Sequence, residues 1–180
     1  MKKIVLTFGL ISGALLSAMM LATVPFIDQI GMDRGVVIGY TTMVLAFLLV
    51  FFGIRSYRET VGGGRISFGR ALGVGLLIMA IATICYVITW EIVYFNFLPD
   101  FGDKYAAYAI EKARAAGASA EEIAKQTEEM RKFKAMYDNP LYNSAFTFLE
   151  PLPVGIPMTL ISAAILRKTR ATDNTDKDRD

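Results

Sequence analysis

Two carboxylates inside apolar runs are the side chains of this sequence best placed to do chemistry. Glu91 and Glu150 are the only charged residues within the four longest apolar runs. An ionised carboxylate is costly to bury in a membrane, so an intramembrane acid suggests a functional site. Such a pair could bind a proton or a cation. The competing interpretation is structural, with one acid at the membrane surface and the other bonded to backbone amides.

The depth of Glu91 favours the structural interpretation. Counting from Arg70 at about 1.5 Å per residue places Glu91 roughly 30 Å along a helix, near the outer boundary of the hydrocarbon core. Tyr86, Trp90 and Tyr94 have the composition of an aromatic belt at the same boundary. We therefore expect Glu91 to be interfacial.

Three prolines beside Glu150 predict a break in its helix. A residue before proline is disfavoured in the α region, so Glu150 and Leu152 are expected to be extended. The last membrane helix should then begin near Pro153, with Pro157 early enough to bend it and Pro151 outside it. At this break the carboxylate could accept hydrogen bonds from the exposed amides that begin the helix. The rival role is a proton- or cation-binding acid like those of broken-helix transporters.

Other chemistry is restricted by composition. The chain has no histidine and one cysteine, which excludes Ser-His-Asp and Cys-His catalysis and nearly every transition-metal site built from nitrogen and sulfur ligands. Cys85 lies inside an apolar run and is interpreted as a small buried hydrophobe. We expect no catalytic residues, no metal site and no cofactor, and interpret the protein as not being an enzyme.

The elements that position the two acids are membrane helices. Hydrophobic residues make up 54% of the 180 residues, and they gather in long runs. A helix needs about 20 apolar residues to cross a bilayer. The sequence therefore predicts an all-α membrane protein, a single domain over residues 1–170, with transmembrane helices at about residues 4–27, 36–54, 71–98 and 146–167. The first run is too long for a cleaved signal peptide and is expected to remain as an anchor.

Positive charge orients these helices. If the four runs alternate in direction, one side carries most of the basic residues near the runs: Lys2, Lys3, Arg55, Arg58, Arg65, Arg70, Arg167, Lys168 and Arg170. The opposite short loop has only Arg34 against Asp28 and Asp33. By the positive-inside rule both termini should be cytoplasmic and the long third loop external. Residues 171–180 read as a polar, disordered cytoplasmic tail.

The external loop, about residues 100–140, predicts a helical hairpin. Its first half is rich in alanine and can end at Gly117, and Ser119 with Glu122 forms a capping-box pattern that opens a second helix. That helix should end near Tyr137. One stripe on it, formed by Ile123, Thr127, Met130, Phe133 and Tyr137, could be a ligand or partner surface. It could equally cover the outer ends of the bundle or lie in the lipid interface.

Small residues recur every four positions on the predicted helices. They are Gly9, Gly13 and Ser17 in the first helix, Gly35 and Gly39 at the second, Gly69 and Gly73 at the third, and Gly155, Thr159 and Ala163 in the fourth. Small residues allow close helix approach in membranes. The pattern indicates packing within the bundle or a homodimer face.

Three segments, "FFGIRSYRE", "GGGRISFGRALGVGLL" and "MYDNPLYNSAFTFLEPLPVGIPMTLISAAILRK", together resemble the domain of unknown function 4199 family. The resemblance covers nearly the whole chain to Arg170. It implies a four-helix, multi-pass protein of the bacterial inner membrane and brings no known activity or site residues.

These observations favour a non-enzymatic inner-membrane protein that acts through helix packing or partner contacts. Its expected partners are the lipid bilayer and either a second copy or another membrane protein, not nucleic acid. The alternative is a small proton- or cation-linked transport or permeation protein that uses Glu91 and Glu150.

Overall fold

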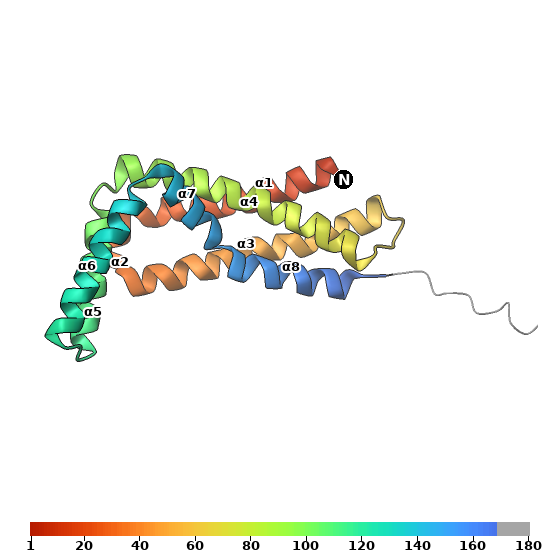
Figure 1. The fold of residues 1–180 in the computed structure, drawn as a ribbon. Coiled ribbons are helices and arrows are strands. Elements are labelled where there is room, and N and C mark those ends of the chain that lie inside the picture. Colours follow the sequence, from red (N-terminus) through yellow and green to blue (C-terminus); the bar gives the residue numbers. More distant parts are fainter. Residues whose placement is uncertain (169–180) are drawn as a thin grey trace, which may run out of the picture.

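The computed structural model describes residues 1–168, and almost all of them are helical (Figure 1). The elements are α1 (Lys2–Thr23), the short 3-10 helix η1 (Val24–Phe26), α2 (Ile27–Ile30), α3 (Met32–Thr60), α4 (Phe68–Phe97), α5 (Phe101–Ala115), α6 (Ala120–Tyr137), α7 (Pro140–Leu149) and α8 (Leu152–Leu166). The predicted all-α class is confirmed. The predicted tail at residues 171–180 lies outside the described residues.

Four stretches of the described chain are long and apolar enough to cross a membrane, as predicted. They cover Lys2–Ile30, Met32–Thr60, Phe68–Phe97 and Pro140–Leu166. The last begins at Pro140 and not near residue 146, because Asn139 caps α7 and Pro140 occupies its first turn. Figure 1 shows the N-terminus and the end of α8 at the same end of the bundle. There, Ile66 and Lys168 exchange two backbone hydrogen bonds of 3.1 and 2.9 Å.

The half of the bundle nearest this end is tightly filled. Phe47, Val50, Ile54 and Ile78 have no exposed surface, and they lie among α1, α3, α4 and α8. Many large apolar side chains on the outside of the bundle are exposed, among them Leu10 on α1 at 53%. An apolar exterior is what a helix bundle presents to lipid. The structure is thus a membrane bundle with a solid core in one half.

A row of small residues lets α1 approach α4 closely. A Cβ on Gly9 would lie 2.8 Å from Cβ of Ile81, and a Cβ on Gly13 would lie 2.6 Å from Cβ of Cys85. Ser17 continues the row with a 2.7 Å hydrogen bond between its hydroxyl and that of Thr89. Larger side chains at these glycines would force the two helices apart.

A second row of small residues packs α8 into the core. A Cβ on Gly155 would lie 2.8 Å from Cγ of Met79. Thr159 is fully buried, and its hydroxyl donates a 2.7 Å hydrogen bond to the Gly155 carbonyl. Ala163 is also fully buried. This face of α8 is therefore closely packed against α3 and α4.

The other small-residue pairs do not pack within the described bundle. A Cβ on Gly35, Gly39, Gly69 or Gly73 would meet no atom within 4 Å. Gly35 and Gly39 instead line a cavity, described below. For these four glycines the expectation of packing inside the bundle is wrong, because repeating small residues permit close helix approach without requiring it.

Helices α5 and α6 lie side by side across the end of the bundle opposite the N-terminus (Figure 1). The predicted capping box is present: the Ser119 side chain accepts from the Glu122 amide at 3.3 Å, and the Glu122 carboxylate accepts from the Ser119 amide at 2.7 Å. Gly117, with φ of +84°, makes the reversal between the helices. The helical hairpin in the third loop is confirmed.

The break at Glu150 is a tight helical turn and not an extended segment. Glu150 has φ −57° and ψ −45°, and Leu152 already belongs to α8, so the expectation of extended residues is wrong. The Glu150 amide donates to the Thr147 carbonyl at 3.3 Å, and the Gly155 amide donates to the Pro151 carbonyl at 2.8 Å. Extended backbone would leave more polar groups unpaired in an apolar layer, which outweighs the preference of the residue before proline.

Candidate ligand-binding cavity

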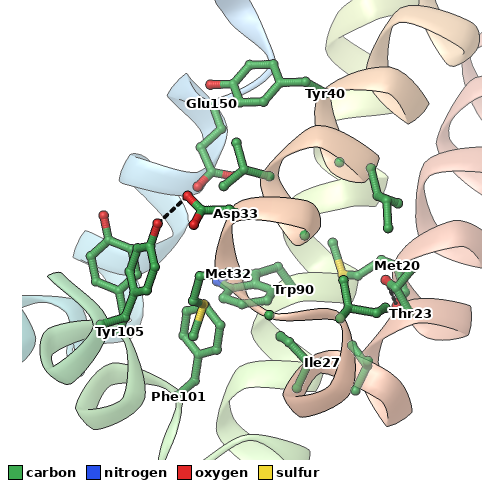
Figure 2. Close-up of a pocket in the computed structure, with 18 of the residues that line it drawn as sticks. Met20, Thr23, Ile27, Met32, Asp33, Tyr40, Trp90, Phe101, Tyr105 and Glu150 are labelled. Atoms are coloured by element: carbon green, nitrogen blue, oxygen red, sulfur yellow. Dashed lines mark hydrogen bonds between the residues drawn. The ribbon is translucent and has the colours of Figure 1, made fainter. Parts of the chain in front are cut away.

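A cavity of about 840 Å³ lies under the α5/α6 hairpin, between the first turns of α3 and the facing parts of α1, α4 and α7 (Figure 2). Its apolar wall includes Leu16, Met20, Ile27, Val36 and Met43. Aromatic rings provide much of the remainder, from Tyr40, Tyr86, Trp90, Phe101, Tyr105, Tyr108, Phe133, Tyr137 and Phe146. Such a lining suits the apolar part of a small molecule.

The cavity exists because α3 begins without a tightly packed neighbour. Gly35 and Gly39 have open space where a side chain would lie, and both contribute to the cavity wall. Val36 and Val37, on the same turns, are 57% and 65% exposed. From Thr42 onward the buried face of α3 enters the filled core, so the space closes along the helix.

Glu150 is the acid of the cavity wall that has no basic partner in the described chain, whereas Asp33 pairs with Lys112. Figure 2 shows Glu150 among the lining residues, at the junction of α7 and α8. Its Oε2 accepts a 2.9 Å hydrogen bond from the Tyr86 hydroxyl on α4. The expectation that Glu150 accepts from the first amides of the last helix is wrong: the N-cap of α8 is Pro151, and α8 has no side-chain cap. The helical backbone at Glu150 leaves its side chain free to bond across to α4.

Glu150 has no ion pair in the described part of the chain. The two lysines that line the cavity pair with other acids: Lys112 with Asp33 at 3.0 Å, and Lys134 with Asp103 at 3.2 Å. Tyr86 is the only donor to Glu150 found within residues 1–168. Within residues 1–168, therefore, no basic side chain neutralises the Glu150 carboxylate.

Three aromatic side chains of α4, those of Tyr86, Trp90 and Tyr94, bond to other parts of the protein. Trp90 Nε1 donates a 3.0 Å hydrogen bond to the Tyr137 hydroxyl, and the Tyr94 hydroxyl donates a 2.7 Å hydrogen bond to Oδ1 of Asp138. Tyr86 bonds Glu150. Each hydroxyl or indole thus has a partner, on α6, at its C-cap Asp138 or at the α7–α8 junction, that periodicity alone does not reveal.

The C-terminal end of α6 is fixed by buried polar bonds. Asn143 is fully buried. Its side-chain amide donates a 3.2 Å hydrogen bond to the Tyr137 carbonyl, and its Oδ1 accepts a 3.2 Å hydrogen bond from the Thr147 hydroxyl. Burial raises the pKa of Tyr137 to about 12, against the effect of its hydrogen bonds to Thr147 and Trp90. The hairpin is thus anchored to α4 and α7 on one side of the cavity.

Ion pairs hold the hairpin on the other side of the cavity. Lys104 on α5 lies 2.8 Å from Oδ1 of Asp28, which is on α2, and its hydrogen bonds to Asp28 and Asp100 raise its pKa. The Tyr108 hydroxyl and the Lys112 amine both donate to Asp33 at the start of α3. These groups are largely exposed, so each pair contributes little stability. They nevertheless place α5 over the cavity.

Glu91 and Glu150 do not share the cavity. Glu91 is half-buried on α4 and does not line the cavity, and its Oε1 is enclosed without a hydrogen-bond partner among residues 1–168.

The other predicted site residues are divided between the cavity and the bundle. Of the α6 stripe, Met130, Phe133 and Tyr137 line the cavity, whereas Thr127 is exposed and its hydroxyl bonds the Ile123 carbonyl of the same helix. Pro151 is buried at the break, and Pro157 lies inside α8.

In the described chain no three Cys, Asp or Glu side chains are grouped so that they could hold a metal ion. Cys85 is used to pack against Gly13. Tyr40, Tyr105 and Tyr108 also line the cavity, and nothing in the sequence predicted this role for them. Their only signal was an excess of aromatic residues near the outer ends of the predicted spans.

The protein is an all-α membrane protein with four helices long and apolar enough to span a membrane. One half of its bundle is tightly filled, and the other half holds an aromatic cavity under the α5/α6 hairpin. The chain belongs to the family described as Protein of unknown function (DUF4199), whose model matches residues 7–168. The resemblance seen in the sequence is therefore confirmed. No curated protein and no solved structure matches the chain.

Proposed function

We propose that this protein is a non-enzymatic, multi-pass protein of the bacterial inner membrane that acts by binding an amphipathic small molecule in the cavity under its hairpin. In this proposal both termini are cytoplasmic and the hairpin is external, in keeping with the basic residues around residues 2–3, 55–70 and 167–168. The observation that carries the proposal is the aromatic cavity of about 840 Å³ with Glu150 in its wall.

The size and lining of the cavity suit a small molecule. Ligand sites are commonly clefts of about 300 to 1,000 Å³ that are mostly apolar and hold a few placed polar groups. Here the polar groups are Glu150, several tyrosine hydroxyls and the ion-paired side chains Asp33, Lys112 and Lys134, and the remaining wall is largely aliphatic or aromatic. A molecule with an apolar body and one polar end would match this distribution.

The filled half of the bundle favours binding over permeation. Phe47, Val50, Ile54 and Ile78 have no exposed surface and none of them lines the cavity. A molecule that entered under the hairpin would therefore meet close-packed side chains before reaching the other end. The separation of Glu91 from the cavity also removes the second acid that the transport alternative would use.

The only tryptophan of the chain, Trp90, lines the cavity and can report its occupancy. A water-soluble amphiphile with a bromine atom on its alkyl chain should quench Trp90 fluorescence saturably in phosphatidylcholine nanodiscs. Gly39→Phe should weaken this binding at least tenfold, because the new ring would occupy the cavity. Gly73→Phe is the matched control, since Gly73 also has open space but lies outside the cavity. Non-saturable quenching, or equal binding by both variants, would refute the proposal.

A further inference from the structure

We propose that the ligand of this cavity is an amphipathic organic cation, whose amine or quaternary ammonium group pairs with Glu150 while its apolar body lies among the aliphatic and aromatic side chains. This inference rests on the proposed binding function and specifies the class of ligand. It follows from the unpaired charge of Glu150, from the aromatic rings of the cavity wall and from the absence of a metal-binding cluster among residues 1–168.

Charge complementarity is the first step. An ionised carboxylate in an apolar membrane site is stabilised mainly by an opposite charge and by hydrogen bonds. Glu150 receives one hydrogen bond, from Tyr86, and no ion pair within residues 1–168. The other charged side chains of the wall, Asp33, Lys112 and Lys134, already form ion pairs with partners on neighbouring elements. A cationic ligand would supply the charge that Glu150 lacks.

The aromatic rings of the cavity wall are the second step. Figure 2 shows Tyr40, Trp90 and Glu150 in the wall of the same cavity, and Tyr86 contacts Glu150 directly. Aromatic faces attract organic cations, most strongly when both groups are withdrawn from water. Aromatic rings also accommodate methyl or methylene groups attached to the charged nitrogen. The site therefore offers a cation both an anion and several ring faces.

An inorganic cation would be held less well. Hard metal ions such as Ca²⁺ require about six to eight oxygen ligands, and Mg²⁺ requires octahedral coordination. Among the described residues no group of three metal-binding side chains exists, and Glu91 lies outside the cavity. Because Asp33 is paired with Lys112, Glu150 is left as a single carboxylate, which matches a singly charged organic group that brings its own apolar surface.

Three probes test whether the cavity prefers a cationic ligand. They share an 11-bromoundecyl chain and differ in the head group, which is trimethylammonium, hydroxyl or sulfonate. Binding is measured by quenching of Trp90 in full-length protein in phosphatidylcholine nanodiscs, which carry no net lipid charge. The ammonium probe should bind at least tenfold more tightly than the alcohol, and the sulfonate most weakly. Glu150→Gln should remove most of the ammonium preference and leave the alcohol affinity unchanged. Glu91→Gln, which removes a carboxylate outside the cavity, should leave both affinities unchanged.

The outcomes distinguish this inference from the proposed function. Equal binding of the ammonium and alcohol probes by the wild type would overturn the cationic ligand while leaving the cavity as a binding site. Saturable quenching by none of the probes would overturn both. Equal losses in Glu150→Gln and Glu91→Gln would show that overall charge, and not Glu150, selects the cation. The head-group comparison in the wild type needs no variant, so it stands even if Glu150→Gln fails to fold.

Discussion

The Tyr86 hydroxyl on α4 donates a 2.9 Å hydrogen bond to Oε2 of Glu150, 64 residues later at the junction of α7 and α8. This bond ties the proline break to the neighbouring membrane helix and holds the carboxylate in the cavity wall. Proline therefore accounts for the turn, whereas Tyr86 accounts for the direction of the acid. We therefore expect stability, and the proposed ligand binding, to depend on this pair.

Tyr86 and Glu150 should be energetically coupled. Glu150→Leu strands the Tyr86 hydroxyl and should lower the free energy of unfolding by about 1 to 3 kcal/mol, whereas Glu150→Gln keeps an acceptor and should lower it less. Once Tyr86→Phe has removed the hydroxyl, Glu150→Leu should cost less than it does in the wild type. Equilibrium unfolding in mixed detergent micelles gives the free energy of unfolding of the wild type, of each single variant and of the double variant Tyr86→Phe with Glu150→Leu. Fully additive losses would show that the bond contributes no stability.

The α1–α4 contact should be intolerant of added volume. Gly13→Ile places its Cβ 2.6 Å from Cβ of Cys85 and should lower the free energy of unfolding by about 1 to 3 kcal/mol. Gly73→Ile makes the same substitution in open space on α4, and Leu10→Ile changes an exposed position. Neither control should be destabilised comparably. Thermal unfolding in detergent that ranks Gly13→Ile with the controls would contradict the close contact.

Membrane orientation can be tested with single cysteines after Cys85→Ala. Lys125 lies on the hairpin with its side chain 78% exposed, and Val61 follows α3 at the opposite end with 52% exposure. Gly63 is a poorer position because its φ of +58° would strain a cysteine. A membrane-impermeant thiol reagent applied to intact cells should label Lys125→Cys and spare Val61→Cys. The opposite pattern would place the termini outside.

Alkaline pH should loosen the anchor of the hairpin. Tyr137 is neutral when protonated, and its folded pKa of about 12 lies above the usual value near 10. Its protonated form is therefore favoured by folding: the stabilisation is complete below pH 10 and is lost as pH rises through 12. The free energy of unfolding of the wild-type protein should therefore fall by an amount on the order of 2 kcal/mol. In Tyr137→Phe, unfolding in ether-linked detergent between pH 9 and 12 should show a smaller decrease; an identical decrease would assign the effect to other groups.

Much of the fold follows from local patterns in the sequence. Four apolar runs specify the spans because a membrane allows few alternatives to helix, and Ser119 with Glu122 specifies the start of α6 through bonds that span only three residues. Gly9, Gly13 and Ser17 share one face of α1, so a shared packing surface could be foreseen. Each of these features depends on residues close together in the chain.

The site was less predictable because its contacts join distant segments. Nothing local to Glu150 indicates Tyr86 as its partner, and Trp90 looks like a lipid-facing residue until Tyr137 is placed beside it. Gly35 and Gly39 have the same spacing as Gly9 and Gly13, yet one pair lines a cavity and the other contacts a helix. Spacing identifies a smooth helix face, whereas the neighbour of that face is decided by the tertiary packing.

Occupancy of the cavity can be measured in a crystal structure of the protein with the 11-bromoundecyl trimethylammonium probe. Bromine scatters anomalously, so its position can be located independently of the protein model. We expect a bromine peak inside the cavity, near Met20, Ile27 or Val36, and density for the ammonium group beside Glu150. Bromine peaks confined to the outer surface of the bundle, with the cavity free of probe density at saturating concentration, would contradict it.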